Sequence, residues 1–393
     1  MYKILTYNNI SPKGLERLPR EAYEIASEIQ HPDAILLRSA DLHGVSIADT
    51  VKAVGRAGAG VNNIPVAEYT RRGIPVFNAP GANSNAVKEL VIAGLLLASR
   101  NICEAWDFAR NLHGEDAAIE KQIEKSKKQF AGFELAGKTI GVLGLGAIGV
   151  KVANTAMALG MRVVGYDPML TVKSAWQLEA SVIQASSIDD LLAQSDFVTL
   201  HVPMNEQTRS LINAERVLSM RQRAVLLNFS RAGTVDEAAV LTALEARRLH
   251  AYVTDFASRQ LIGRKGAIVL PHLGASTAEA EENCAVMVVD QVRDFLENGN
   301  IINAVNLPEV TMPRTEGCRL GIANENVPNM VGQISSILAE SGLNIVDLLN
   351  KSRGDVAYTL VDLHAEVSAA TLERVRAIPG VLSCRIVCDN GRS

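Results

Sequence analysis

The sequence predicts an α/β protein with two successive parallel α/β layers and a small C-terminal domain. Three observations predict this class. Short apolar runs alternate with helical patterns over most of the chain, as they do in parallel sheets. A Gly-x-Gly-x-x-Gly motif at 144–149 joins one such strand to a helix. Residues 316–393 follow the order strand–helix–strand–strand–helix–strand, which is typical of ferredoxin-like domains.

The composition excludes several classes of protein. The chain has 393 residues, which is enough for two or three domains, and 48% of them are hydrophobic. A net charge of −4 and an aromatic content of 4% argue against a nucleic-acid partner, since such proteins usually carry a basic face. The longest apolar run, at 90–99, is too short to span a bilayer, and the start of the chain lacks a secretion signal. We therefore expect a cytoplasmic protein with neither a nucleic-acid nor a membrane partner.

The cysteines indicate a reducing compartment. They are odd in number and scattered, with no Cys-x-x-Cys pair and no histidine at zinc-ligand spacing. We expect reduced thiols and no metal site. The five positions are Cys103, Cys284, Cys318, Cys384 and Cys388.

The first layer comes from residues 1–90. Its apolar runs predict strands at 2–7, 34–39, 51–58 and 74–80, with helical stretches at 14–29 and 47–54. A glycine cluster, GRAGAGVNN at 55–63, follows the third strand but has neither a third glycine nor a downstream acid. We interpret it as a loop that offers N–H groups to an anion, with Arg56 beside it. The alternative is a simple turn.

A polar segment separates the two layers. Residues 85–112 show a long helical pattern that breaks near Gly114, and the stretch 111–130 is polar with its charges spaced as on a helix. This predicts an exposed helix or arm. A solvated linker is the alternative.

The second layer predicts a doubly wound sheet of about six strands. Its expected strands are 138–146, 162–167, 196–203, 224–230, 251–256 and 267–271, with helices at 147–160, 187–195, 213–220 and 236–249. A long helix at 278–299 then leads to a linker at 311–317. The C-terminal elements are expected at 318–325, 330–342, 344–351, 356–366, 369–380 and 381–388.

The glycine motif predicts a dinucleotide site. Gly144 permits a tight turn, Gly146 lets the backbone approach a pyrophosphate, and Gly149 allows close packing of helix on strand. The free N–H groups at the start of the helix would meet the phosphate. Asp167 ends the next strand, where a carboxylate accepts the ribose hydroxyls and repels a 2′-phosphate, which favours NAD over NADP. The alternative is a glycine-rich turn without a ligand.

Two residues at strand ends carry the candidate chemistry. Arg231, in NFSRAGTVDE, ends a parallel strand, where a guanidinium points into the ligand crevice and can hold a carboxylate. His272, in VLPHLGAST, follows Pro271, which ends the last strand because proline has no N–H. Oxidation of a 2-hydroxy acid needs this set, since nicotinamide takes the hydride, a cation holds the carboxylate and a base takes the proton. The alternatives are a loop-capping arginine and a strand-end histidine.

The chain resembles the D-isomer-specific 2-hydroxyacid dehydrogenases along essentially its whole length. The motifs GRAGAGVNN, NAPGANSNAVKELV, GLGAIG, HVPMNEQT, NFSRAGTVDE and PHLGAST stand in family order. The resemblance implies a Rossmann-type NAD-binding domain at 91–283, inserted in a flavodoxin-like substrate-binding domain made of 1–90 and 284–312. It also implies a C-terminal ferredoxin-like ACT regulatory domain at 316–393. Dimerisation in this family usually runs through the dinucleotide domain, so a homodimer or homotetramer is expected.

The resemblance implies oxidation of D-3-phosphoglycerate to 3-phosphohydroxypyruvate with NAD, the first step of the phosphorylated route to serine. The ACT domain and the extra arginines favour this phosphorylated substrate. The nearest alternative is a reductase for glyoxylate, hydroxypyruvate or another 2-ketoacid. A non-enzymatic NAD-sensing scaffold, like the corepressors built on this fold, is disfavoured because those relatives lack an ACT tail.

The resemblance also implies residue roles. Arg231 and His272 correspond to the active-site arginine and the acid/base histidine. The cofactor is expected to contact Gly144, Gly146, Ala147, Ile148, Gly149, Asp167, His201, Val202, Pro203, Phe229, Ser230, Asp255, Leu273, Gly274 and Ala275. The substrate is expected to contact Arg56, Gly58, Ala59, Gly60 and Asn83, with Arg38 helping to hold the phosphate.

The chain departs from the family pattern beside the histidine. Gln260, in DFASRQLIG, stands where family members usually carry a glutamate that pairs with the histidine. A glutamine accepts a hydrogen bond from the imidazole but supplies no charge to stabilise the imidazolium. Either the enzyme works with Gln260 as a neutral orienting residue, or its activity is reduced.

The expected effector loop departs from the pattern as well. Serine-inhibited relatives usually carry histidine where Asn324 stands and glycine where Asn329 stands, whereas Asn326 and Asn344 match. We expect L-serine to bind at a dimeric ACT interface through Asn324, Asn326 and Asn344. The alternative is an ACT domain kept only for assembly.

Overall fold

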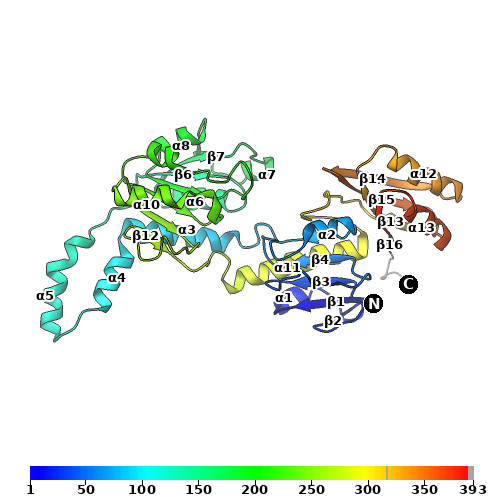
Figure 1. Cartoon of the computed structure of the whole chain (residues 1–393), viewed down its shortest axis with the longest axis horizontal. Coiled ribbons are helices and arrows are strands. Elements are labelled where there is room, and N and C mark those ends of the chain that lie inside the picture. The colour runs from blue at the N-terminus through cyan, green and yellow to red at the C-terminus, as the bar shows by residue number, and fades with distance from the viewer. Residues whose placement is uncertain (316, 388–393) are drawn as a thin grey trace. The chain divides into compact units, whose positions relative to one another are not determined.

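A computed structural model describes residues 1–315 and 317–387 of the chain. It divides into two compact units, which are described separately here. Unit 1 contains Met1–Asn83 and Ala278–Ser393, and unit 2 contains Ser84–Thr277. In Figure 1 unit 2 is drawn in cyan and green, whereas unit 1 is blue at its first segment and yellow to red at its second. The chain therefore leaves unit 1 once and returns to it once.

Unit 2 is built on a seven-stranded parallel sheet in the order β12-β11-β10-β9-β6-β7-β8. Its central strands are buried on both faces, which explains their continuous apolar runs. The order of strands reverses between β6 and β9, where α/β sheets open a ligand crevice. The strands are β6 (Thr139–Leu143), β7 (Arg162–Tyr166), β8 (Ile183–Gln184), β9 (Phe197–Leu200), β10 (Ala224–Asn228), β11 (Leu249–Thr254) and β12 (Ala267–Val269). The expected sheet is confirmed, but β8 was missed because two residues leave no periodic pattern.

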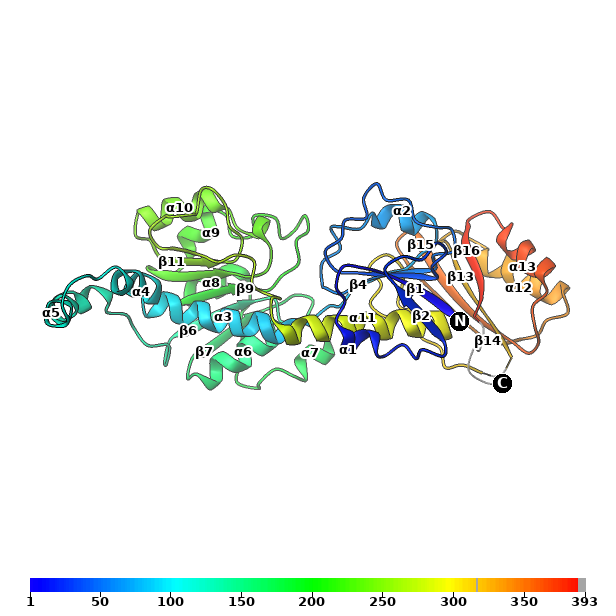
Figure 2. The same cartoon turned by 90° about the horizontal axis from the view of Figure 1, so that it is seen from below.

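Helices cover both faces of this sheet, which makes it doubly wound (Figure 2). One hydrophobic cluster joins the sheet to α3 (Ser84–Ser99) and α6 (Gly149–Ala158). A second cluster joins the other face to α8 (Ile188–Gln194), α9 (Ala214–Ser219) and α10 (Glu237–Glu245). A one-turn helix, α7 (Val172–Ala175), follows β7. Side chains from the strands therefore pack on both sides of the sheet.

An exposed arm extends from unit 2. The single helix expected over 85–112 is wrong, because α3 ends at Ser99 and α4 (Ile102–Arg110) starts after Asn101, whose φ of 49° is left-handed. The polar segment forms α5 (Asp116–Ser126), as the arm interpretation predicted. Neither α4 nor α5 contains a buried residue.

The first part of unit 1 is a five-stranded parallel sheet in the order β2-β1-β3-β4-β5. Its elements are β1 (Tyr2–Tyr7), α1 (Pro12–Leu15), β2 (Tyr23–Ala26), β3 (Ala34–Leu37), β4 (Ala53–Arg56), α2 (Val66–Arg71) and β5 (Val76–Phe77). The long α11 (Ala278–Asn298) packs on it and joins its hydrophobic core. Gly14 lets α1 approach α11 closely, because a Cβ at Gly14 would lie 2.7 Å from that of Ala285.

Two expected helices in this sheet are wrong. The stretch 14–29 contains only the end of α1 and then β2, which pairs in parallel with β1 from Tyr23 onward. The stretch 47–54 turns and enters β4. Both stretches are short amphipathic segments, and a strand of four residues cannot be distinguished from a helical turn by periodicity alone.

The second part of unit 1 contains a four-stranded antiparallel sheet in the order β14-β15-β13-β16. The elements follow the expected order: β13 (Cys318–Glu325), α12 (Met330–Glu340), β14 (Ile345–Arg353), β15 (Val356–Leu363), α13 (Ala369–Arg376) and β16 (Val381–Val387). Buried side chains of both helices pack on one face of the sheet. We call it the C-terminal sheet. Cys388, where the last strand was expected to end, lies outside the described residues.

A buried ion pair ties the C-terminal sheet to α11. Arg319 on β13 and Asp362 on β15 are 1% and 2% exposed, and they form two hydrogen bonds of 2.6 and 2.7 Å. The remaining guanidinium donors bond the main-chain oxygens of Asn298, Met312 and Pro313. Burial alone would raise the pKa of Asp362, but the hydrogen bonds from Arg319 and Thr315 hold it below its ordinary value. The pair is thus satisfied on every side.

Arg319→Met should destabilise unit 1 by about 3–5 kcal/mol, because it leaves the Asp362 carboxylate buried and unpaired. Denaturant unfolding would measure the loss. Arg374→Met is the control, since Arg374 pairs with Glu340 at the surface, where such pairs contribute at most about 1 kcal/mol. Equal losses in the two variants would contradict this account of the joint.

Candidate active site

The candidate residues of unit 2 all follow the ends of strands. Because the seven strands are parallel, their carboxyl ends open on the same edge of the sheet. Neighbouring strands therefore present their terminal residues side by side. The six positions are Gly144 after β6, Asp167 after β7, His201 after β9, Arg231 after β10, Asp255 after β11 and His272 after β12.

The three glycines of the motif have different steric reasons. Gly144 has a φ of 90°, and a Cβ there would lie 2.5 Å from the main-chain oxygen of His201. A Cβ on Gly149 would lie 1.9 Å from the oxygen of Gly144. A Cβ on Gly146 would meet nothing within 4 Å. The first and third glycines are therefore required by the fold, whereas the second leaves open space beside the start of α6, which suits a phosphate group.

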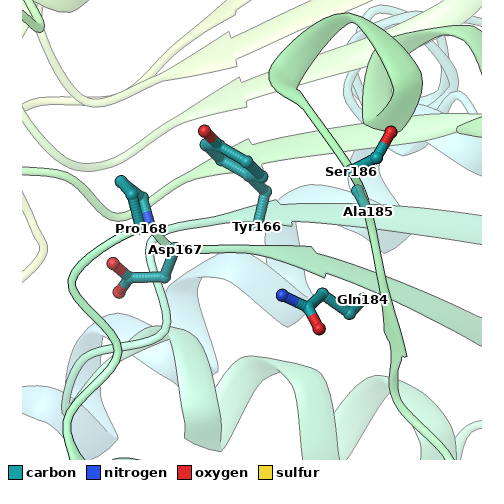
Figure 3. A pocket seen from close by; sticks show the side chains of 6 residues that line it. All are labelled: Tyr166, Asp167, Pro168, Gln184, Ala185 and Ser186. Atoms are coloured by element: carbon teal, nitrogen blue, oxygen red, sulfur yellow. The ribbon is translucent and has the colours of Figure 1, made fainter.

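Asp167 is held beside this loop. Its Oδ2 accepts the N–H of Leu145 at 2.8 Å, and its Oδ1 accepts the N–H of Met169 at 2.8 Å. Figure 3 shows the pocket that it lines, with the Gln184 amide contributed by the neighbouring strand β8. The full lining is Tyr166, Asp167, Pro168, Gln184, Ala185 and Ser186. The sequence analysis missed the last three because it missed β8.

His201 stays neutral. Its Nε2 lies 3.0 Å from the hydroxyl of Thr199, and its Nδ1 is buried with no hydrogen bond to any described residue. Burial lowers the pKa of His201 to about 3. A neutral, unpartnered ring nitrogen here remains available to a ligand.

A turn at the end of β12 wraps around Asp255. The main-chain oxygen of Asp255 accepts the N–H of His272 at 2.9 Å, and its Oδ2 accepts the N–H of Gly274 at 3.0 Å. Asp255 is 2% exposed, and its Oδ1 is buried without a partner among the described residues. Burial raises the pKa of the Asp255 carboxyl, whereas the Gly274 N–H and the charge of His272 act to lower it. The His272 side chain is exposed and meets the ring of Phe256 edge-on, with centroids 5.3 Å apart.

Arg231 presents its side chain from a fixed base. Its main-chain oxygen accepts hydrogen bonds from Asn228 at 3.0 Å and Thr234 at 2.7 Å, both of which are fully buried. Its own Nη1 donates to the oxygen of Ser230 at 2.7 Å, and the residue is exposed. The arrangement leaves further guanidinium donors toward solvent, as a carboxylate-binding residue needs.

The remaining cofactor candidates lie in the same loops as the residues above. They are Ala147 and Ile148 after β6, Val202 and Pro203 after β9, Phe229 and Ser230 after β10, and Leu273 and Ala275 after β12. Gln260 differs from them. It lies exposed in the loop before β12, and its main-chain oxygen accepts a bond from Arg264. Within residues 1–315 and 317–387 its side chain makes no hydrogen bond, so its orienting role stays a prediction.

The substrate candidates lie in unit 1, around the end of β4. Arg56 donates from Nε to the oxygen of Arg38 at 3.0 Å and from Nη1 to that of Gly60 at 2.6 Å. A Cβ on Gly58 would lie 2.7 Å from the same Nη1, so the glycine loop folds around this guanidinium. Arg38 pairs with Glu281 at 2.7 Å. Ala59 belongs to the same loop, and Asn83 is half-buried just before α3.

The effector candidates are not together in one chain. Asn324 is 1% exposed on β13, and its amide donates to the oxygen of Glu325. Asn326 is exposed after β13 and donates to Gly354 O, whereas Asn344 precedes β14 and bonds His364. Since Gly354 and His364 flank opposite ends of β15, Asn326 and Asn344 lie at opposite ends of the C-terminal sheet.

Two searches of the described residues bear on other functions. They contain no group of three or more histidine, cysteine, aspartate or glutamate side chains placed to hold a metal. Nor do they include a helix with the length and apolar character needed to cross a membrane.

Two comparisons relate the chain to known sequences. The family model described as D-isomer specific 2-hydroxyacid dehydrogenase, NAD binding domain, matches residues 102–274. A curated D-3-phosphoglycerate dehydrogenase from Synechocystis sp. is 36% identical over 359 residues, which are 85% of this chain and 62% of that protein. One from Escherichia coli K12 is 32% identical over 356 residues, which are 87% of this chain and 83% of that protein.

A third comparison concerns solved structures. The NAD+-bound 3-phosphoglycerate dehydrogenase of Entamoeba histolytica matches with a TM-score of 0.60 and 24% identity, covering 78% of this chain and 98% of that one. At this identity the likeness shows the fold alone. The chain also spans only 62% of the length of the Synechocystis relative.

Wild-type protein should bind NADH at least about 10²-fold more tightly than NADPH, because Asp167 would meet the 2′-phosphate as an unpaired neighbouring charge. Asp167→Ala should narrow this ratio. Fluorescence titration with both dinucleotides measures it. Gln184→Ala is the control, since it changes the same pocket without changing charge and should leave the ratio as it is. Equal affinity of the wild type for both dinucleotides would refute the role of Asp167.

Proposed function

Because the chain belongs to the D-isomer-specific 2-hydroxyacid dehydrogenase family, we propose that it oxidises D-3-phosphoglycerate to 3-phosphohydroxypyruvate with NAD. The names of its relatives support this substrate. The observation that carries the proposal is the edge of the unit 2 sheet. There, the neighbouring strands β10, β11 and β12 end in an exposed arginine, a buried carboxylate and an exposed histidine.

The residues of unit 2 fit a bound dinucleotide. The open space at Gly146 and the start of α6 suit the pyrophosphate, and Asp167 suits the ribose hydroxyls. The buried, unpartnered Oδ1 of Asp255 and Nδ1 of His201 suit polar groups of the cofactor, since buried polar atoms need hydrogen bonds. NAD would accept the hydride from C2 of the substrate.

Arg231 and His272 would act on the substrate itself. Arg231 would hold the substrate carboxylate through two parallel hydrogen bonds, which fixes the position of C2. His272, in its neutral form, would take the proton of the C2 hydroxyl while the hydride leaves the same carbon. In the reverse direction the imidazolium returns that proton. Arg38, Arg56, Gly58 to Gly60 and Asn83 stay predicted substrate contacts.

Self-association is part of the proposal. The arm formed by α4 and α5 has no buried residue, and it exposes Ile102 (42%), Trp106 (61%) and Ile123 (40%). Exposed apolar side chains of this size mark interaction surfaces. We propose that the arm packs on a second copy of the chain, as a homodimer or as part of a homotetramer. The reduced thiols Cys103, Cys284, Cys318 and Cys384 suit a cytoplasmic location.

We propose further that the C-terminal sheet is an ACT regulatory domain that binds L-serine. Its edge strand β14 has one unpaired side. Antiparallel pairing of β14 with the β14 of a second copy would bring Asn326 of one chain near Asn344 of the other. Their amides would then hydrogen-bond the carboxylate and amino groups of serine between the two chains.

The substrate is tested by NADH formation. The wild type should give its highest kcat/KM with D-3-phosphoglycerate and NAD. With NADH, glyoxylate and hydroxypyruvate should be reduced less efficiently than 3-phosphohydroxypyruvate. His272→Ala should lower kcat about 10²–10⁴-fold in both directions, because general acid/base catalysis is lost, while NADH binding persists. A kcat near that of the wild type would return His272 to a strand-end residue, and a preference for glyoxylate would overturn the substrate.

Calorimetry tests regulation. L-serine should bind at millimolar concentration or below, whereas D-serine is the control ligand and should not bind. Asn326→Ala should weaken binding about tenfold or more, because a hydrogen bond to a charged group is lost. Absence of heat with L-serine would leave a C-terminal domain that serves assembly alone.

A further inference from the structure

We propose that Asp255 is the positioning residue of His272: it holds the histidine's turn in place and supplies the negative charge that Gln260 lacks. This inference rests on the proposed function, because that function gives His272 its acid/base role. It goes beyond the expected contact between Asp255 and the cofactor.

The first support is backbone geometry. His272 has a φ of 24°, which is a strained conformation for a residue with a side chain. Such conformations persist only where surrounding bonds impose them. Two bonds to Asp255 bracket this residue, from the N–H of His272 to the main-chain oxygen and from the N–H of Gly274 to Oδ2. Asp255 therefore determines where the imidazole starts from the backbone.

The second support is the burial of the carboxylate. Asp255 is 2% exposed at the end of β11, between the ends of β10 and β12. Charges interact more strongly where water is excluded. The side chain of His272 interacts electrostatically with this carboxylate, and the interaction favours the ionised form of Asp255. Because such coupling is mutual, the carboxylate stabilises the imidazolium by the same free energy.

The other titratable groups around Asp255 do not compete for this role. Tyr252, on β11 itself, is 1% exposed, and burial raises its pKa to about 12, so it is neutral at physiological pH. Glu237, on α10, also acts on Tyr252, and its Oε2 accepts the hydroxyl of Ser258. Gln260 is exposed and uncharged. Asp255 is thus the buried anion that His272 faces.

Asp255→Asn separates the two parts of the role. The amide oxygen can still accept the N–H of Gly274, but the negative charge is gone. The imidazole should then lose its proton at lower pH. Oxidation, which needs the neutral ring, should have its acidic limb moved down by about one pH unit. Reduction near pH 7.5, which needs the imidazolium, should fall about tenfold. Asp255→Ala loses the bond as well, so kcat should fall further in both directions.

A second readout needs neither cofactor nor substrate. The pH titration of the His272 ring, identified in NMR spectra by its absence in His272→Ala, should shift down by about one unit in Asp255→Asn. Asp196→Asn is the matched control. Asp196 also accepts a main-chain N–H, that of Thr139 at 2.9 Å, but it precedes β9 at the opposite edge of the sheet. Its substitution should leave the titration of His272 unchanged.

The outcomes are distinguishable. An unchanged ring titration and an unchanged acidic limb in Asp255→Asn would overturn the inference, whatever the substrate proves to be. A downward shift of the ring titration in a protein that does not oxidise D-3-phosphoglycerate would support the inference and refute the proposed function. A shift of the same size in Asp196→Asn would show a general charge effect and would also overturn it.

Discussion

The common direction of the strands in unit 2 is the constraint on which the rest of the site depends. Because β6 to β12 run in parallel, loops that are far apart in the chain leave the sheet at one edge. The glycine loop, Asp167, Arg231, Asp255 and His272 are neighbours for this reason. Their local geometry then follows from close packing, as at Gly149, where a Cβ would overlap the oxygen of Gly144. Chemistry is therefore placed by topology and refined by a few hydrogen bonds.

The same logic assigns the C-terminal sheet to unit 1. The Arg319–Asp362 pair uses side-chain donors to bind main-chain oxygens at the end of α11 and in the segment that follows it. A buried charge of this kind is stable only when every donor is satisfied. The sheet is therefore integrated into the unit through α11. Ligand binding at the sheet would act on a packed part of the fold, which is a physical requirement for regulation.

Much of this site could be predicted because its signals are local. The glycine spacing, the acid at the end of β7 and Pro271 before His272 can each be recognised within a few residues. Two elements could not be recognised in this way. β8 has only two residues, and β2 became a strand because it pairs with β1, a contact that no local pattern encodes. The link from Asp255 to His272 is likewise a tertiary contact, formed by bonds between separate loops.

A crystal structure of the protein with NAD and D-3-phosphoglycerate bound would test the central claim most directly, namely that this edge of the sheet performs the reaction. The account predicts the His272 imidazole within about 2.6–3.2 Å of the substrate hydroxyl. It also predicts the Arg231 guanidinium on the substrate carboxylate and the pyrophosphate at Gly146. A substrate bound away from these strand ends, or an imidazole turned from the hydroxyl, would contradict it.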